Sequence, residues 1–168
     1  MAAIDAETLG ALFDRHGPAL VLYARQWCGT PEDVVQDAFV TLARARGLPD
    51  RVLPWLFRVV RNAAINAGRG ARNRKARESR SSSAEAWLAS DDDRIDASAA
   101  ARLLEDLDPP EREALVARFW GGLTFDEIAR LQGCSVATAH RRYQNGLTHL
   151  NERLAGRWNP QTSTPNAT

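Results

Sequence analysis

The sequence predicts an all-α protein made of two small helical domains joined by a flexible linker, with a helix-turn-helix in the second domain. No segment alternates apolar and polar residues with the period of two that is typical of a β-strand. Apolar residues recur instead at helical spacing, in segments bounded by proline and glycine. Between two groups of such segments, residues 79–96 are serine-rich and then acidic, without a sustained period. This composition is typical of a linker.

Residues 1–78 form the first predicted domain. Gly17 and Pro18 should separate two short amphipathic helices, because proline interrupts helical hydrogen bonding. The next helix starts at TPED, residues 30–33, where a capping hydroxyl precedes a proline and two acids at the positive end of the helix dipole. It should run to about Gly47. A long helix then begins near Pro54, with an inner apolar stripe formed by Trp55, Leu56, Val59, Val60 and Ala63.

Residues 97–157 form the second predicted domain. Asp108 and the two prolines after it start a helix that Gly121 and Gly122 should stop. Residues 158–168 (NPQTSTPNAT preceded by Trp158) have no apolar face, so we expect a disordered tail.

Residues 123–143, LTFDEIARLQGCSVATAHRRY, carry start signals for two helices. Thr124 and Glu127 have the spacing of a capping box, and Ser135 can cap the second helix. Gly133 between them suits the left-handed backbone of a sharp turn. The stretch therefore predicts either a DNA-binding helix-turn-helix or an ordinary helical hairpin. On its second helix, the inward spacing belongs to Val136, Ala139, Tyr143 and Leu147.

The net charge of +1 conceals a strong asymmetry along the chain. Residues 44–80 contain eleven basic residues against Asp50 and Glu78, whereas residues 1–43 and 85–113 are acidic. Such a block gives one surface a positive field suited to a polyanion, although a solvated charged face would have the same composition. The bias towards arginine favours phosphate and base recognition.

Several classes of protein are not expected from the composition. No apolar run is long enough to span a bilayer, and the N-terminus lacks the form of a signal peptide, so we expect a cytoplasmic protein without membrane insertion. Cys28 and Cys134 are isolated and should be reduced structural thiols. The three histidines are scattered, and no acid–histidine–nucleophile group or glycine-rich phosphate loop occurs. We therefore expect no enzyme, no metal site and no cofactor.

Three segments follow one another along the chain: PEDVVQDAF from residue 31, PWLFRVVRNAAIN from residue 54, and LDPPEREALVARFWGGLTFDEIARLQGCSVATAHRR from residue 107. Together they resemble the extracytoplasmic-function group of bacterial RNA polymerase sigma factors, over nearly the whole chain outside linker and tail. The resemblance implies two helical domains that bind core RNA polymerase. The first (residues 1–78) would recognise and melt the −10 promoter element, and the second (residues 97–157) would bind the −35 element. Members of the group are commonly held inactive by anti-sigma proteins, so such a partner is implied as well.

The resemblance implies a polymerase-docking surface on the first of these segments. Its contact candidates are Asp33, Gln36, Asp37 and Phe39. Electrostatics at a helix start would also explain Asp33, but Asp37 lies beyond the first turn. Phe39 could equally belong to the core.

The second segment and its basic continuation resemble the family's −10 element binding helix. Asn62 matches an asparagine that, in relatives, helps form the pocket for an extruded base. Because strand melting also needs a basic track along the backbone, the −10 candidates are Arg58, Arg61, Asn62, Arg69, Arg72, Arg74 and Lys75. Trp55 matches a family aromatic, but its place on the apolar stripe favours a core role.

The helix that begins near Ser135 should read the −35 element in the major groove. Its candidates are Ser135, Ala137, Thr138, His140, Arg141, Arg142, Gln144 and Asn145. Arg141 and Arg142 suit guanine or phosphate, and asparagine can pair with adenine. Relatives often carry arginines where His140 and Asn145 stand, a departure that concerns which −35 sequence is bound.

Two other functions remain open at this level. A DNA-binding regulator that never joins polymerase would also need the helix-turn-helix, but it would have no use for the first-domain segments. A pure interaction module would have no DNA affinity at all.

Overall fold

The computed structural model describes residues 4–78 and 102–157, and every regular element within them is a helix. The predicted all-α fold is confirmed. The elements are α1 (Ala6–Ala24), α2 (Pro31–Arg44), α3 (Val52–Glu78), α5 (Pro109–Leu115), the π-helical turn η1 (Val116–Trp120), α6 (Phe125–Gln132) and α7 (Val136–Arg157), with a further helical turn at residues 102–105. The predicted linker and tail lie outside the described residues. None of the described helices is long and apolar enough to cross a membrane.

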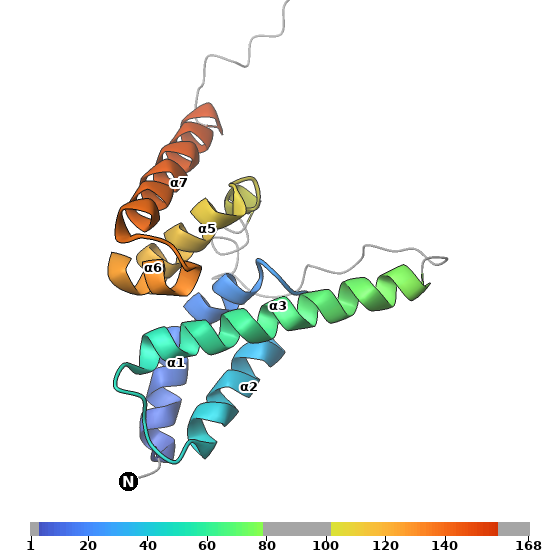
Figure 1. The fold of residues 1–168 in the computed structure, drawn as a ribbon, viewed down its shortest axis with the longest axis vertical. Helices are drawn as coiled ribbons and strands as arrows, with labels where there is room; N and C mark the ends of the chain where they lie inside the picture. Colours follow the sequence, from blue (N-terminus) through green and yellow to red (C-terminus); the bar gives the residue numbers. More distant parts are fainter. Residues whose placement is uncertain (1–3, 79–101, 158–168) are drawn as a thin grey trace, which may run out of the picture.

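The first three helices pack on one another and form the body of the first domain (Figure 1). The fully buried side chains between them include Leu20 of α1, Val35 and Leu42 of α2, and Leu56 and Val60 of α3. The C-terminal half of α3 extends beyond this body, and its side chains from Ala71 to Ala76 are exposed. The predicted long helix is therefore confirmed, and its basic end projects from the rest of the domain.

Helix α1 corrects the expectation of two short helices separated at Gly17 and Pro18. It runs without a break from Ala6 to Ala24, with Pro18 inside it. Proline removes one helical hydrogen bond, but Leu20 and Tyr23, just after it, are fully buried. Burial of two large side chains offsets that cost, because each contributes about 1.5–3 kcal/mol.

The position at which α2 starts was predicted correctly, but the side-chain cap expected there is absent. Pro31 occupies the first turn, with Glu32 and Asp33 beside it, as expected. Thr30, however, makes no side-chain capping hydrogen bond, since its backbone (φ −125°, ψ 56°) departs from the usual extended cap geometry. The helix ends at Arg44, somewhat before Gly47.

In the second domain, α5 and η1 form one continuous stretch of helix that Gly121 terminates, as the sequence predicted. Its last turn is wider than an α-helical turn, because the amide of Gly121 donates to the carbonyl of Val116, five residues back. Helix α7 packs on α5 and α6.

The two domains pack against each other, which the expectation of two units joined only by a flexible linker did not include. Helix α1 contacts η1, α3 contacts α6, and the buried apolar side chains of both domains form one cluster. Gly121 lies so close to Phe57 that a Cβ atom there would come within 2.4 Å of the ring. Only glycine allows this approach. Figure 1 shows the second domain seated over α1 and the first half of α3.

Candidate nucleic-acid and partner interface

The α6–α7 unit has the backbone geometry of a helix-turn-helix. The Thr124 hydroxyl accepts from the Glu127 amide (3.3 Å), and the Glu127 carboxylate accepts from the Thr124 amide (2.8 Å). Gly133 adopts the predicted left-handed backbone at φ 64°. The Ser135 hydroxyl then caps α7 by accepting from the Thr138 amide at 3.1 Å. The capping box, the glycine turn and the second cap are all confirmed.

The start of α7 presents a mixed polar surface. Ala139 is buried, and Tyr143 and Leu147 are half-buried, as their spacing predicted, whereas Val136 is 46% exposed and not inward as expected. Val136 is the first residue of α7. Exposed candidates on this surface are Ser135, Ala137, His140, Arg141, Gln144 and Asn145.

Four of the −35 candidates make local contacts. Thr138 is half-buried and its hydroxyl accepts from that of Ser135 at 2.9 Å. The His140 ring meets the Phe125 ring edge-on, with centroids 4.8 Å apart. Arg142 is half-buried and donates from Nη1 to Oε1 of Gln132 at 3.0 Å. These contacts fix the side chains before any ligand arrives.

The −10 candidates lie along α3, and most of them are exposed. At about 100° per residue, Arg58, Asn62 and Arg69 share one face of the helix. Further candidates in the projecting half are Arg72, Arg74 and Lys75, which are exposed without an ion pair to any described residue. Trp55 is half-buried and packs against the core, which agrees with the structural role favoured by its spacing.

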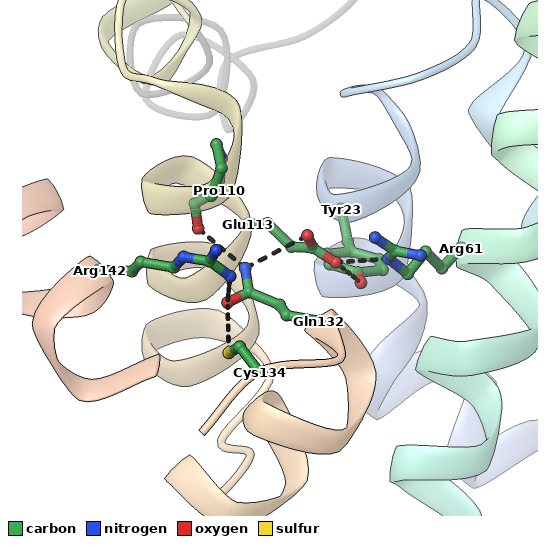
Figure 2. A network of polar contacts seen from close by, with 7 residues as sticks. All are labelled: Tyr23, Arg61, Pro110, Glu113, Gln132, Cys134 and Arg142. Carbon is green, nitrogen blue, oxygen red and sulfur yellow. Dashed lines mark hydrogen bonds and ion pairs between the residues drawn. The ribbon is translucent and has the colours of Figure 1, made fainter. Parts of the chain in front are cut away.

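Arg61 is the exception on α3, because it points towards the second domain. Its Nε donates to Oε1 of Glu113 at 2.7 Å, and its guanidinium lies over the Trp27 ring, 5.6 Å from the centroid. Tyr23 donates from its hydroxyl to the same oxygen at 2.7 Å. Figure 2 shows Tyr23 of α1 and Arg61 of α3 converging on Glu113 of α5.

Burial and charge at this network shift two pKa values. Burial, together with the negative charge of Glu113, raises the pKa of Tyr23 well above its ordinary value, so the hydroxyl remains a donor. Burial opposes the charge of Arg61, but the hydrogen bond and charge of Glu113 raise the pKa of Arg61 overall. Arg61 is therefore charged while its Nε donates to Glu113.

On α2, the predicted docking residues divide into two groups. Asp33, Gln36 and Asp37 are exposed on one face, whereas Phe39 is only 4% exposed and stacks edge-on against Phe13, with centroids 5.0 Å apart. Phe39 therefore belongs to the core, the alternative that its position left open. Val40, 43% exposed, is the apolar residue on the outer face.

Two relevant residues escaped the sequence-based prediction. Val40 lies seven residues after Asp33, so helical spacing would have placed it on the same face. Glu113 stood among the acids of residues 85–113 and gave no local signal, because its partners come from distant parts of the chain. Within the described residues, no group of three or more metal-ligating side chains gathers, and both cysteines are free thiols.

Comparison with known families finds two matches. Residues 12–75 match the family model described as Sigma-70 region 2, and residues 98–150 match Sigma-70, region 4. The RNA polymerase sigma factor CarQ of Myxococcus xanthus is 34% identical over 152 residues, covering 85% of this chain and 87% of CarQ.

Two solved structures are similar over most of their length. CnrH, solved in complex with the cytosolic domain of CnrY, is 28% identical with a TM-score of 0.59, over 90% of each chain. The sigma factor RpoE of Bartonella quintana, solved with the anti-sigma factor NepR, has a TM-score of 0.65 over 90% of this chain and 98% of RpoE. Its identity of 22% supports likeness of fold.

Proposed function

The chain belongs to the extracytoplasmic-function group of RNA polymerase sigma factors, and from that membership we propose that three of its surfaces bind polymerase, the −10 element and the −35 element. As a sigma factor it binds core RNA polymerase and directs promoter recognition, DNA melting and transcription initiation. The co-occurrence of regions 2 and 4 in one chain carries this conclusion, because a simple helix-turn-helix regulator needs only the second. We assign polymerase docking and −10 recognition to residues 1–78, the linker to 79–96, −35 recognition to 97–157, and a tail to 158–168.

The outer face of α2 docks on polymerase. Asp33, Gln36 and Asp37 supply polar and negative contacts, and Val40 supplies an apolar contact in place of the buried Phe39. Exposed like-charged acids on one face favour a basic partner surface, which accelerates and orients association.

The face of α3 that carries Arg58, Asn62 and Arg69 follows the melted −10 strand. Arginines bind the backbone, and Asn62 offers an amide to the edge of an extruded base. The projecting basic end, with Arg72, Arg74 and Lys75, attracts phosphates regardless of sequence. Arg61 adds to these backbone contacts when it is not paired with Glu113.

The exposed start of α7 lies in the major groove of the −35 element. Its caps hold Ser135 and Thr138 near the backbone of the turn, where hydroxyl groups suit phosphate contacts. Arg141 is exposed and can pair bidentately with guanine, and Asn145 with adenine.

Two further properties follow from membership in this group. The chain acts where RNA polymerase acts, in the cytoplasm, and it contributes no catalytic residue of its own. Because a structural relative was solved with an anti-sigma factor, and such proteins commonly inhibit the group, we infer an anti-sigma partner for this chain too.

Run-off transcription with core polymerase tests the proposal. Wild-type protein should support a transcript from a promoter selected from random sequence, and the double variant Asp33→Lys/Asp37→Lys should lose it, because lysines oppose the partner surface. The matched control Glu7→Lys/Asp14→Lys makes the same charge change at exposed sites of α1 and should remain active. Circular dichroism should show unchanged helix content. If the wild-type protein does not bind core polymerase, the sigma-factor function is rejected and the alternative, a DNA-binding regulator that never joins polymerase, takes its place.

A further inference from the structure

The Glu113 carboxylate connects the two domains through hydrogen bonds from three helices. Oε1 accepts from the Tyr23 hydroxyl of α1 and from Arg61 Nε of α3, both at 2.7 Å, and Oε2 accepts from Gln132 Nε2 of α6 at 3.2 Å. The Glu113 side chain is only 6% exposed. Since two donors come from the first domain and the third from the second, this carboxylate is shared across the interface (Figure 2).

Glu113 holds Arg61 in the manner in which a nucleic-acid backbone would. Carboxylate and phosphate oxygens are equivalent acceptors for guanidinium nitrogens. Here Glu113 takes Nε of Arg61 while the Trp27 ring covers the guanidinium face. A phosphate and Glu113 therefore cannot both occupy the Nε side of Arg61.

The same network continues to the recognition helix. Gln132 donates from Nε2 to the Pro110 carbonyl (2.8 Å) and to Glu113, and its Oε1 accepts from Arg142 Nη1 of α7 (3.0 Å). The amide of Gln132 is thus fixed at both ends. Through it, one buried carboxylate is connected to basic side chains from both promoter-facing surfaces.

We propose that Glu113 closes the free chain on itself and competes with promoter DNA for Arg61. This inference rests on the proposed assignment of Arg61 to the −10 strand. Two other contacts support the closed form: the ion pair between Arg51 Nη1 and Glu127 Oε1 at 2.7 Å, and the packing of Gly121 against Phe57. Because only open molecules bind the strand, the closed fraction lowers the apparent DNA affinity in proportion.

The test compares Glu113→Gln with Asp106→Asn in the full-length protein. Each variant removes one negative charge from a carboxylate paired with an arginine, but Asp106 pairs with Arg153 at the surface of the second domain and does not reach the first. The probe is a fluorescent single strand of about twenty thymidines. If about nine-tenths of wild-type molecules are closed, Glu113→Gln should bind it about tenfold more tightly than Asp106→Asn does. Arg61→Gln added to Glu113→Gln should abolish this difference.

A distance measurement follows the domains directly. Dyes on cysteines introduced at the exposed positions Arg44 and Asn151, with Cys28 and Cys134 changed to serine, should show lower energy transfer in Glu113→Gln than in Asp106→Asn. Equal affinity and equal transfer in the two variants would overturn the proposal.

Tyr23→Phe provides a second variant in case Glu113→Gln does not fold. It removes only the hydroxyl that donates to Glu113 and leaves both proposed promoter surfaces untouched. It should give a smaller gain in strand affinity and the same direction of change in energy transfer, and a wild-type result in both measurements would contradict the closed form. The run-off transcription of the wild-type protein does not depend on these variants. If the strand-binding and energy-transfer tests fail, the closed form is rejected and the sigma-factor assignment stands. If the wild-type protein fails in run-off transcription, the sigma-factor assignment is rejected whatever these variants do.

Discussion

The projecting end of α3 and the start of α7 both present polar side chains outward, but they hold them differently. Arg72, Arg74 and Lys75 are exposed and form no ion pair with any described residue. On α7, Arg142 is fixed by a hydrogen bond to the Gln132 side chain. A long unfixed cation suits a phosphate of any sequence, whereas a preorganised group suits one base edge. We therefore propose that the projecting end of α3 supplies affinity and the start of α7 supplies specificity.

The largest effect should come from removing charge at the projecting end of α3. Changing Arg72, Arg74 and Lys75 to glutamine should weaken binding of the polymerase holoenzyme to every promoter alike. The slope of log affinity against log salt should flatten by up to about 0.9 for each lost duplex contact. Titrations at several salt concentrations measure it.

The matched control for this variant changes Arg15, Arg44 and Arg46, three exposed arginines away from the projecting end, to glutamine. It alters net charge equally and should leave the slope near the wild-type value. An unchanged slope in the α3 variant would contradict the role proposed for the projecting end of α3, because Arg72, Arg74 and Lys75 would then not contact phosphates.

A smaller and sequence-dependent effect should come from Asn62. Asn62→Ala should slow open-complex formation at the matching −10 sequence several-fold, in line with about 1 kcal/mol for one lost hydrogen bond. Binding to fully duplex DNA of unrelated sequence should be nearly unchanged. Permanganate reactivity of unpaired thymines follows the opening.

Asn66→Ala is the control, since Asn66 is also an exposed asparagine, one turn further along α3. It should open promoters at the wild-type rate. Equal losses for Asn62→Ala on matching and unrelated DNA would indicate a folding or phosphate role for Asn62 instead.

Features that depend on neighbouring residues were predictable from the sequence. The caps at Thr124 and Ser135 join groups three residues apart, and the left-handed turn at Gly133 depends on that residue alone. Positions along α3 followed from helical spacing for the same reason. Thr30 is the local exception, because its backbone geometry, which the side chain does not determine, prevents the cap.

Features that depend on distant residues were not predictable. The Tyr23–Glu113 bond spans 90 residues and the Arg61–Glu113 bond spans 52, so neither periodicity nor a motif indicates them. The uninterrupted course of α1 through Pro18 has the same origin, since it depends on what Leu20 and Tyr23 pack against. Sequence patterns therefore predicted the surfaces that face outward better than the contacts between the domains.

The smallest effect on promoter activity should come from Thr124, and it tests whether the recognition surface is preorganised. Thr124→Ala removes the hydroxyl that caps α6, while Glu127 keeps its bond to the backbone amide and its ion pair with Arg51. Loss of such a cap costs about 1 kcal/mol. For a domain of this size the thermal midpoint should fall by roughly 4–8 °C.

Thr148→Ala is the control, because its hydroxyl only bonds back to the Gln144 carbonyl within α7, an interaction that contributes little to helix stability. Well below the midpoint, Thr124→Ala should discriminate −35 sequences as the wild type does, since the fold that fixes Ser135 and Arg142 is intact. Loss of discrimination without loss of stability would mean that the cap itself positions α7 against DNA.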